Sequence, residues 1–334
     1  MTNTMPRKIT LLSLLLVLVA ALAAGCGGDG RGGDDEASDE TTTQSGGGGD
    51  LSGRIQADGS STVGPFTTAA AERFRDVEPD VQITVGVSGT GGGFERFCRG
   101  ETDLSNASRA IADEEAQICA DAGIEYTEFQ VANDALTVVV NKANDWADCL
   151  TVEQLQTIWG PDSTVSSWRD VDPSFPDEKL TLFGPGTDSG TFDYFTDAIN
   201  GEEGASRSDY AASEDDNTIV TGVSGEPGGL GYFGFSYFEE NQDTLKAVEI
   251  DGGDGCVAPS VESAQDGTYT PLSRPLFVYA KNESFARPEV EAFVGYALEH
   301  ETEIAEAAQF VPLTEQQLDT AQADFDAAVE AAAS

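Results

Sequence analysis

Residues 182–191, LFGPGTDSGT, followed directly by FDYFTDAI, contain the pattern that decides the fold. The first two residues are apolar and typical of a strand end, whereas the next eight hold three Gly and a Pro, which favour a tight turn. Phe192, Phe195 and Ile199 then recur at helical spacing. The stretch predicts a strand, a loop with bare hydroxyls and amides, and a helix.

Two other loops have the same character. Residues 59–63 (GSSTV) and 88–93 (SGTGGG) each lie between an expected strand and an expected helix. Small residues leave the backbone N–H groups unobstructed, and the first turn of a helix adds unpaired donors with a partial positive charge. None of the loops is a GxxxxGK[ST] nucleotide loop. The three loops therefore predict a site for a small tetrahedral oxyanion.

The rest of the chain alternates short strands with helices, which predicts an α/β fold with parallel pairings. The expected strands are residues 54–57, 81–87, 103–107, 125–131, 135–140, 180–183, 245–250 and 276–281. The expected helices are residues 66–77, 94–97, 113–122, 152–159, 192–199, 288–309 and 314–333, whereas residues 200–230 appear only as a polar segment with Gly-rich ends.

This order predicts two lobes, with residues 51–131 and 270–334 in lobe I and residues 132–269 in lobe II. The chain then crosses between the lobes twice. A double crossing is typical of a hinge, and the cleft between hinged lobes is where a ligand is expected.

The N-terminal residues indicate export. Residues 1–25 carry Arg7 and Lys8, then an apolar run shorter than the ~20 residues that a membrane span needs, which favours a signal peptide over a transmembrane anchor. Residues 22–26, LAAGC, resemble the lipobox of bacterial lipoproteins, which implies a lipid on Cys26. Residues 26–50 have almost no apolar side chain and predict a disordered tether on the extracytoplasmic face of the membrane.

The formal net charge of −43 comes from 60 acidic and 17 basic residues. It excludes a basic patch for nucleic acid and is typical of a heavily solvated surface in high salt. The acidic runs at 214–217 and 251–254 lack the spacing of a calcium loop, so we expect no metal site.

Four cysteines remain besides Cys26, and an even number in an exported chain favours two disulfides. Four cysteines allow three pairings. We prefer Cys98–Cys119 with Cys149–Cys256, because the first two lie in one half of the chain and would close a local loop. A zinc site is the alternative, but the chain has no CxxC and no neighbouring His to support it.

Residues 85–111, which include SGTGGGF, together with LFGPGTDSGT, SRSDYAASEDDN and GGLGYFGFSYFEEN, resemble the PstS family of phosphate-binding proteins of ABC transporters. The resemblance extends over nearly all of the chain from residue 51. It implies a type II periplasmic-binding-protein fold, capture of inorganic phosphate for membrane permease subunits, and a monomer with no cofactor and no catalytic activity.

The resemblance also implies binding positions. In the three loops they are Ser61, Thr62 and Val63, then Ser88 and Thr90, then Ser189, Gly190 and Thr191. Arg109 stands where the family has an aspartate, and Pro185 where it has an arginine, so we expect Arg109 to supply the charged donor and Asp188 the acceptor. Ser108 and Arg207 are further candidates.

Two other functions stay open. A receptor for sulfate or molybdate would share every loop feature. An exported phosphate-ester hydrolase with a Ser-His-Asp arrangement would need a histidine, and the only one, His300, lies in an expected acidic helix. The chain also lacks a GxSxG elbow.

Overall fold

A computed structural model describes residues 51–187 and 189–333, which belong to one compact unit. The predictions for the signal peptide at residues 1–25, the tether at residues 26–50 with Cys26, and the acceptor Asp188 lie outside the described residues.

A mixed sheet forms the centre of the fold, and in the described part of the chain it has nine strands. Along the sheet lie β2 (Val81–Val85), β1 (Gly53–Gly59), β3 (Leu104–Ala107), β12 (Ser273–Lys281), β4 (Tyr126–Asn141), β8 (Gly229–Gly234), β6 (Thr181–Gly184) and β7 (Ala211–Ala212), while β9 (Leu245–Ala247) also pairs with β4. β1 is parallel to β2 and β3, but β12 is antiparallel to β3 and β4. The prediction of parallel pairings is therefore only partly correct.

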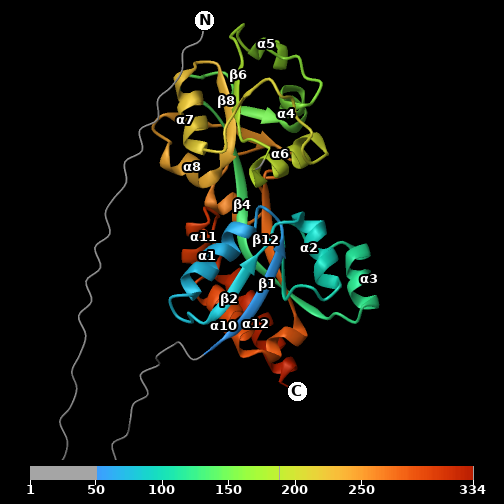
Figure 1. Ribbon diagram of the computed structural model, residues 1–334. Coiled ribbons are helices and arrows are strands. Elements are labelled where there is room, and N and C mark those ends of the chain that lie inside the picture. The colour runs from blue at the N-terminus through green and yellow to red at the C-terminus, as the bar shows by residue number, and fades with distance from the viewer. Residues whose placement is uncertain (1–50, 188, 334) are drawn as a thin grey trace, which may run out of the picture. The chain divides into compact units, whose positions relative to one another are not determined.

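Strand β4 is one continuous strand of 16 residues, so the prediction of separate strands at 125–131 and 135–140 is wrong. The polar pair Asn133 and Asp134 interrupts the apolar pattern in the sequence, yet both residues are buried and paired with β12. The first part of β4 pairs with β12, and the part from Leu136 onward pairs with β8. Figure 1 shows β4 and β12 running side by side from one half of the fold into the other.

Two large hydrophobic cores lie on either side of this crossing. Residues from Ile55 to Ala132 and from Leu276 to Ala328 build the first core, which we call the core of lobe I. Residues from Leu136 to Leu272 build the second, the core of lobe II. On each of the two chain crossings, a residue of the core of lobe I and a residue of the core of lobe II are four positions apart: Ala132 and Leu136, then Leu272 and Leu276. Two such crossings form a two-segment hinge.

Lobe I is covered by α1 (Gly64–Phe74), α2 (Gly89–Cys98), α3 (Asp113–Asp121), η1 (Asn282–Ala286), α10 (Pro288–Glu299), α11 (Glu301–Ala307) and α12 (Glu315–Ala332). The helix expected at residues 288–309 is broken at His300. The break turns the Glu301 side chain inward, where its carboxylate accepts a hydrogen bond from the backbone N–H of Leu313 at 2.9 Å. A buried carboxylate that finds this donor favours the break over a continuous helix.

Lobe II carries α4 (Val152–Trp159), α5 (Trp168–Val171), α6 (Gly190–Asn200), α7 (Asp216–Gly225), α8 (Phe235–Glu240) and α9 (Val261–Gln265). A small second sheet joins β5 (Cys149–Thr151), β10 (Glu249–Asp251) and β11 (Cys256–Val257). Residues 200–230, expected to hold no element, contain β7 and α7. The short apolar face of α7, Ile219, Val220 and Val223, is buried, but polar neighbours hide its period in the sequence.

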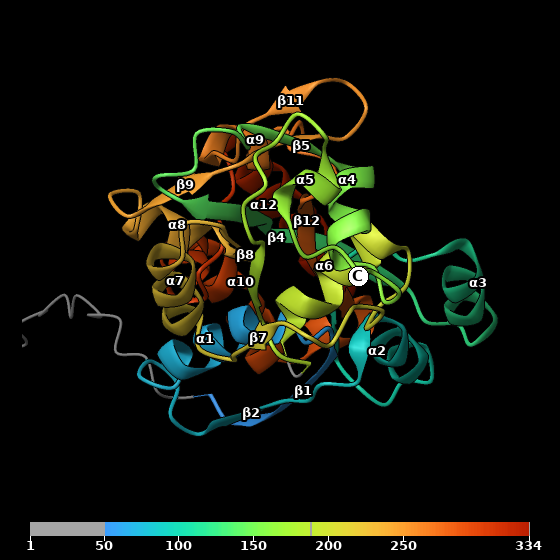
Figure 2. The ribbon, with the colours of Figure 1, turned by 90° about the horizontal axis from the view of Figure 1, so that it is seen from above.

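Both predicted disulfide pairings are confirmed. Cys98–Cys119 joins the end of α2 to α3, which lie side by side at one flank in both views (Figure 1, Figure 2). Cys149–Cys256 joins β5 to β11 within the small sheet. The first closes a loop of 21 residues and the second a loop of 107 residues.

Loop length predicts unequal stabilisation by the two disulfides. We expect the variant Cys149→Ser/Cys256→Ser to lose about 5 kcal/mol of unfolding free energy and Cys98→Ser/Cys119→Ser about 3 kcal/mol, because a longer closed loop restricts the unfolded chain more. Urea unfolding followed by circular dichroism measures both. A larger loss in the Cys98/Cys119 variant would contradict the expectation.

Candidate functional site

The predicted anion loops all lie at helix N-termini, as expected. Loop 1, residues 59–63, precedes α1; loop 2, residues 86–88, precedes α2; loop 3, described at residues 185–187 and 189, precedes α6. The prediction of a loop over residues 88–93 and a helix from residue 94 is wrong in extent, because α2 already begins at Gly89. The residues that begin α1 and α2, Val63 and Ser88, make no side-chain cap. Ser189 caps α6 by accepting a hydrogen bond from Thr191 N at 3.2 Å. In α1 the N–H groups of Val63 and Gly64 already donate to Ser60, and Pro65 has no N–H. The first turn of α2 keeps N–H donors that no cap side chain occupies.

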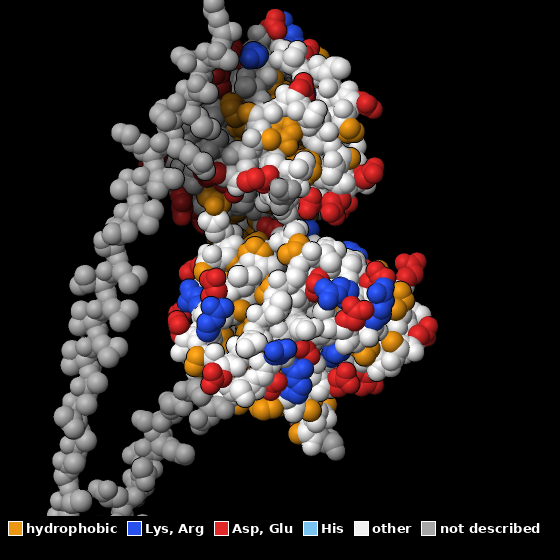
Figure 3. Space-filling view, viewed as in Figure 1, with side chains coloured by type: hydrophobic (Ala, Val, Ile, Leu, Met, Phe, Trp, Pro, Cys, Tyr) orange, Lys and Arg blue, Asp and Glu red, His pale blue; other side chains and the backbone are white. Residues whose placement is uncertain are grey.

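A polar cavity of about 630 Å³, here called the main cleft, lies between the lobes. Figure 3 shows the molecule narrowing between the two halves. The cavity falls within the ~300–1,000 Å³ of small-molecule sites. Lobe I contributes Ser60, Ser61, Thr62, residues 88–92, Ser108, Arg109 and Ala110; lobe II contributes Asp193, Tyr194, Asp197 and Glu203; the hinge contributes Thr270, Pro271, Ser273, Arg274 and Pro275.

A second cavity of about 200 Å³, here called the side pocket, is lined by the end of loop 3 and the first residues of α6. Its lining includes Ser189, Gly190 and Thr191 with Asp134 and Asp216. Ser61 and Thr62 line both the side pocket and the main cleft. Loop 1 thus meets loop 2 in one cavity and loop 3 in the other, so the three loops meet pairwise rather than in a single cavity.

Loop 1 and the start of α6 approach so closely at Gly190 that a larger residue there would displace the Thr62 side chain. A Cβ at Gly190 would lie 2.8 Å from Thr62 Oγ1 and 3.1 Å from Thr62 Cα. Thr62 Oγ1 donates to the Gly190 carbonyl oxygen at 3.5 Å. The family motif residues of lobe I and lobe II are therefore in direct contact across the hinge.

Arg274, at the start of β12, is the functional candidate that the sequence did not indicate. Its Nη2 donates to Thr62 Oγ1 at 3.0 Å and its Nε lies 3.3 Å from Asp134 Oδ2. Its guanidinium carbon lies 3.5 Å from the centre of the Tyr194 ring on α6. β12 was expected to begin at residue 276, so Arg274 fell in a segment without predicted structure. One side chain therefore connects loop 1, the hinge strand β4 and lobe II.

Asp134 is buried beside this arginine. Burial raises the pKa of Asp134, and the charge and hydrogen bond of Arg274 oppose the rise. Tyr194 is held in place by a hydrogen bond from its hydroxyl to the Pro271 carbonyl oxygen at 2.7 Å. The Arg274 position is thus fixed from three sides, which suits a group that orients an anion or closes the lobes.

Arg109 lines the main cleft, as expected of a charged donor, but much of its guanidinium is already bound. Nη1 and Nη2 each donate to a carboxylate oxygen of Glu115 on α3 at 2.8 Å. This hydrogen bond raises the pKa of Arg109 against the opposing effect of burial. The guanidinium has five N–H donors, so some remain for a ligand, while its charge is partly neutralised.

Of the other residues predicted to bind the anion in lobe I, two line the main cleft and one does not. Thr90 and Ser108 face each other, with their hydroxyl oxygens 3.0 Å apart, and both line the main cleft. Val63 is fully buried and its N–H donates to Ser60 Oγ at 3.4 Å, so it lines neither cavity.

Arg207 does not reach the cleft. Its guanidinium donates to Asp209 and to the carbonyl oxygens of Ile158 and Val165, and it lines neither the main cleft nor the side pocket. The structure therefore places this candidate in the packing of lobe II, where its side chain holds the chain next to α4.

Carboxylates of lobe II face the donors of lobe I. Asp193, Asp197 and Glu203 line the main cleft opposite loops 1 and 2. Burial, followed by the charge of Glu203, raises the pKa of Asp193, whereas its hydrogen bond with Ser61 and the charge of Arg274 lower it. An anion in the cleft is therefore expected to sit against lobe I.

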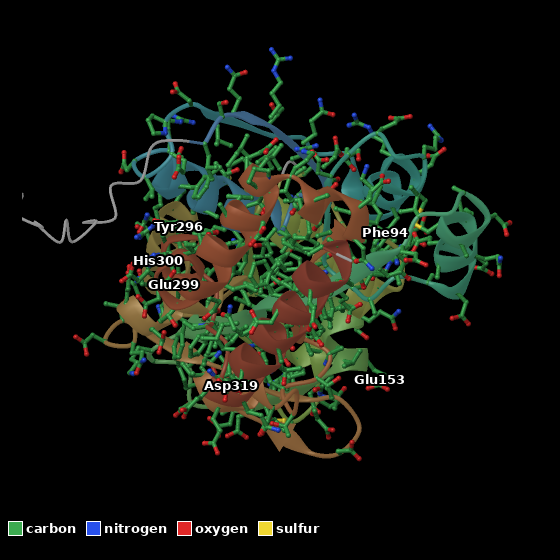
Figure 4. The ribbon with its side chains drawn as sticks, turned by 90° about the horizontal axis from the view of Figure 1, so that it is seen from below. Phe94, Glu153, Tyr296, Glu299, His300 and Asp319 are labelled. Carbon is green, nitrogen blue, oxygen red and sulfur yellow. A yellow bond between two sulfur atoms is a disulfide. The ribbon has the colours of Figure 1, made fainter. Side chains whose placement is uncertain are left out.

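His300 does not belong to this site. Figure 4 shows it with Tyr296 and Glu299 at the end of α10, on the opposite side of lobe I from Phe94 on α2. Its ring packs against Tyr296 at 4.3 Å and it lines neither cavity. Within residues 51–187 and 189–333 no group of three or more His, Cys, Asp or Glu side chains could hold a metal ion. No helix in that part of the chain is long and apolar enough to span a bilayer.

Two lobes, two crossing strands and a polar cleft lined by helix N-termini define a substrate-binding protein of the periplasmic type. A family model described as "PBP superfamily domain" matches residues 36–301. Protein SphX of Synechococcus elongatus is 48% identical over 78% of this chain and 77% of its own, and the phosphate-binding protein PstS of Staphylococcus saprophyticus is 40% identical over 82% and 85%.

Solved structures agree with these relatives. A possible phosphate-binding protein from Planctomyces limnophilus superposes with a TM-score of 0.81 at 48% identity, over 84% of this chain and 99% of that one. A phosphate transport receptor from Vibrio cholerae, at 21% identity and a TM-score of 0.61, covers 78% and 100% and shares the fold. The chain belongs to the PstS family of phosphate-binding proteins.

Loss of Arg274 is expected to destabilise the hinge. In Arg274→Ala the buried carboxylate of Asp134 has no charged partner, and we expect a loss of about 3–5 kcal/mol in unfolding free energy. Adding Asp134→Asn should restore part of that loss, since the unpaired charge is removed. Urea unfolding of the two variants measures this, and equal stability of the single variant and wild type would contradict it.

Asp216, in the side pocket, is expected to make stability depend on pH. Burial, then the charges of Asp215 and Glu214, raise its pKa from 3.8 to about 6. A raised pKa means that the proton stabilises the fold below pH ~4, and that this stabilisation is lost as pH rises through about 6. We expect Asp216→Asn to gain about 1 kcal/mol over wild type at pH 7.5 relative to pH 4, after allowance for solvent contact. Urea unfolding at the two pH values checks it.

Proposed function

We propose that this protein captures inorganic phosphate between its lobes outside the cytoplasm and delivers it to an ABC importer. The observation that carries the proposal is the main cleft, where the uncapped N-terminus of α2 and the loop before α1 open onto one cavity among serine and threonine hydroxyls. Such donors suit a tetrahedral oxyanion. The relatives named phosphate-binding proteins support phosphate as that anion.

The ligand would use donors from both lobes. Ser61, Thr62, Ser88, Thr90 and Ser108 lie in the main cleft with the guanidinium of Arg109, and Ser189, Gly190 and Thr191 lie behind Thr62. Arg274 adds a second guanidinium at the hinge. Because donors on both lobes are complete only when the lobes are together, phosphate would shift the population from open to closed forms.

The proposal extends to the delivery of the protein to the membrane. A signal peptide at residues 1–25, a lipid on Cys26 and a tether to residue 50 would hold a monomeric receptor near its permease. The negative net charge of −43 does not oppose capture, because screening shortens to ~3 Å at 1 M salt. Local donors in the cleft therefore decide binding, and we expect no catalysis.

Calorimetry on the soluble chain from Leu51 tests the proposal. We expect tight one-to-one binding of phosphate and far weaker binding of sulfate and molybdate. Tighter binding of sulfate or molybdate would assign a different oxyanion to the same cleft. No binding of any of the three anions would refute the receptor function, and turnover of a chromogenic phosphate ester would support a hydrolase instead.

Thr90 provides a site-directed test. Thr90→Val removes one cleft hydroxyl at constant shape, and a hydrogen bond to a charged ligand is worth about 1.5–3 kcal/mol, so we expect phosphate affinity to fall about 10- to 100-fold. Thr221→Val is the matched control, since its hydroxyl donates to Asn217 O at 2.8 Å on α7 outside both cavities. Equal affinities of the two variants would exclude Thr90 from the site.

A further inference from the structure

A buried carboxylate lies directly behind loop 2 without lining the cleft. Asp58, at the end of β1, is 4% exposed and lines neither the main cleft nor the side pocket. Its Oδ1 accepts the hydrogen bond from Ser88 Oγ, and its Oδ2 pairs with Nη1 of Arg96. Arg96 is itself held by Glu101, whose Oε2 accepts from Nε at 3.2 Å.

The packing around Asp58 fixes the position of its carboxylate. Gly86 directly follows β2, and a Cβ on it would collide with Asp58 Oδ2. The absence of a side chain at Gly86 therefore provides the space for the carboxylate. A Cβ on Gly93 would lie 2.5 Å from Gly59 Cα, so α2 packs directly on the residue after Asp58. The backbone N–H of Ser88 donates to Gly59 O at 3.1 Å. Asp58, near the end of β1, and Ser88, at the N-cap of α2, are therefore fixed relative to each other.

The Ser88 hydroxyl has its proton committed to Asp58. A hydroxyl has one proton and two acceptor positions, whereas the Asp58 carboxylate accepts from Ser88 at one oxygen and from Arg96 at the other. Ser88 stands at the N-cap position of α2, where a hydroxyl ordinarily accepts from the helix, yet its side chain makes no such bond. Its lone pairs are thus free, and Ser88 lines the main cleft.

We infer that Asp58 makes Ser88 a hydrogen-bond acceptor for the protonated oxygen of the bound anion, and so selects phosphate over sulfate. The inference deepens the proposed function and rests on it. Phosphate near neutral pH keeps at least one proton to donate, whereas sulfate has none and would place its lone pairs against those of Ser88. A site whose polar group is left unpaired by the wrong ligand discriminates strongly. Ser88 touches the ligand, and Asp58 is a positioning residue.

Other acceptors face the same cleft and must be separated from this one. Asp193, Asp197 and Glu203 of lobe II line the main cleft, and Asp193 interacts with Ser61 and Arg274. Each could accept from a protonated anion without any contribution from Asp58. The contact from Ser88 to Asp58 differs because both of its residues belong to lobe I.

The variant Asp58→Asn reverses the direction of the Ser88 hydroxyl. Since Arg96 only donates, the amide oxygen of asparagine must face Arg96 and the amide nitrogen must face Ser88. Ser88 then accepts from the amide and turns its own proton to the cleft. We expect the ratio of phosphate to sulfate affinity to fall at least about tenfold, with sulfate affinity rising. The arsenate to selenate ratio should fall likewise, because arsenate keeps a proton and selenate does not.

Asp103→Asn is the matched control. Asp103 is a buried carboxylate of lobe I that accepts from Ser284 Oγ at 3.1 Å and from Arg287 Nη1 at 2.9 Å, but it lines neither cavity. Its variant loses the same chemistry far from the ligand, so both ratios should stay at the wild-type value. Asp193→Asn measures the contribution of the lobe II carboxylate in the same titrations.

Ser88→Ala gives a second test, which leaves the ion pair between Asp58 and Arg96 in place. We expect phosphate affinity to fall and sulfate affinity to rise, because the variant removes both the acceptor for phosphate and the lone pairs that oppose sulfate. Calorimetry on variants whose circular dichroism matches wild type measures both. If Asp58→Asn does not fold, Ser88→Ala decides alone. Unchanged ratios in the folded variants, or a fall only in Asp193→Asn, would overturn the inference. Failure of wild type to bind phosphate would instead refute the proposed function, and the inference with it.

Discussion

The antiparallel pairing of β4 with β12 is the constraint on which both lobes depend. Its ladder runs from Tyr126 opposite Lys281 to Ala135 opposite Ser273, and the first core ends and the second begins beside it. Every other strand of the large sheet is placed outward from these two. Because two strands, β4 and β12, connect the lobes within residues 51–187 and 189–333, the lobes can rotate about them while each core stays packed.

The chemistry of the site follows from the position of this ladder. Arg274 stands at the point where β12 enters the ladder, and its partner Asp134 is the register neighbour on β4. The same side chain contacts Thr62 of lobe I and Tyr194 of lobe II. A change in the angle between the lobes must therefore alter the surroundings of one guanidinium, which couples ligand binding to the hinge.

The sequence predicted the features that depend on local pattern. The strand, loop and helix units around loops 1 to 3, both disulfides and the double crossing were all visible in residue types and spacing. The features it did not predict depend on contacts that are distant along the chain. Asp134 looked like an interruption of a strand because its partner Arg274 is 140 residues away. Arg207 looked like an available donor, since no local pattern shows that the carbonyl oxygens of Ile158 and Val165, 49 and 42 residues away, bind its guanidinium. Val63 is the exception, because its N–H is bound by Ser60, three residues away.

Helix α2 is held at two points. Its fifth residue, Gly93, packs on Gly59 of β1, and its last residue, Cys98, is bonded to Cys119 of α3. A helix held in this way loses little conformational entropy when the ligand binds. The entropic cost of ordering the N–H donors falls on folding and disulfide formation rather than on ligand binding. A covalent bond remote from the cleft thus contributes to affinity through rigidity alone.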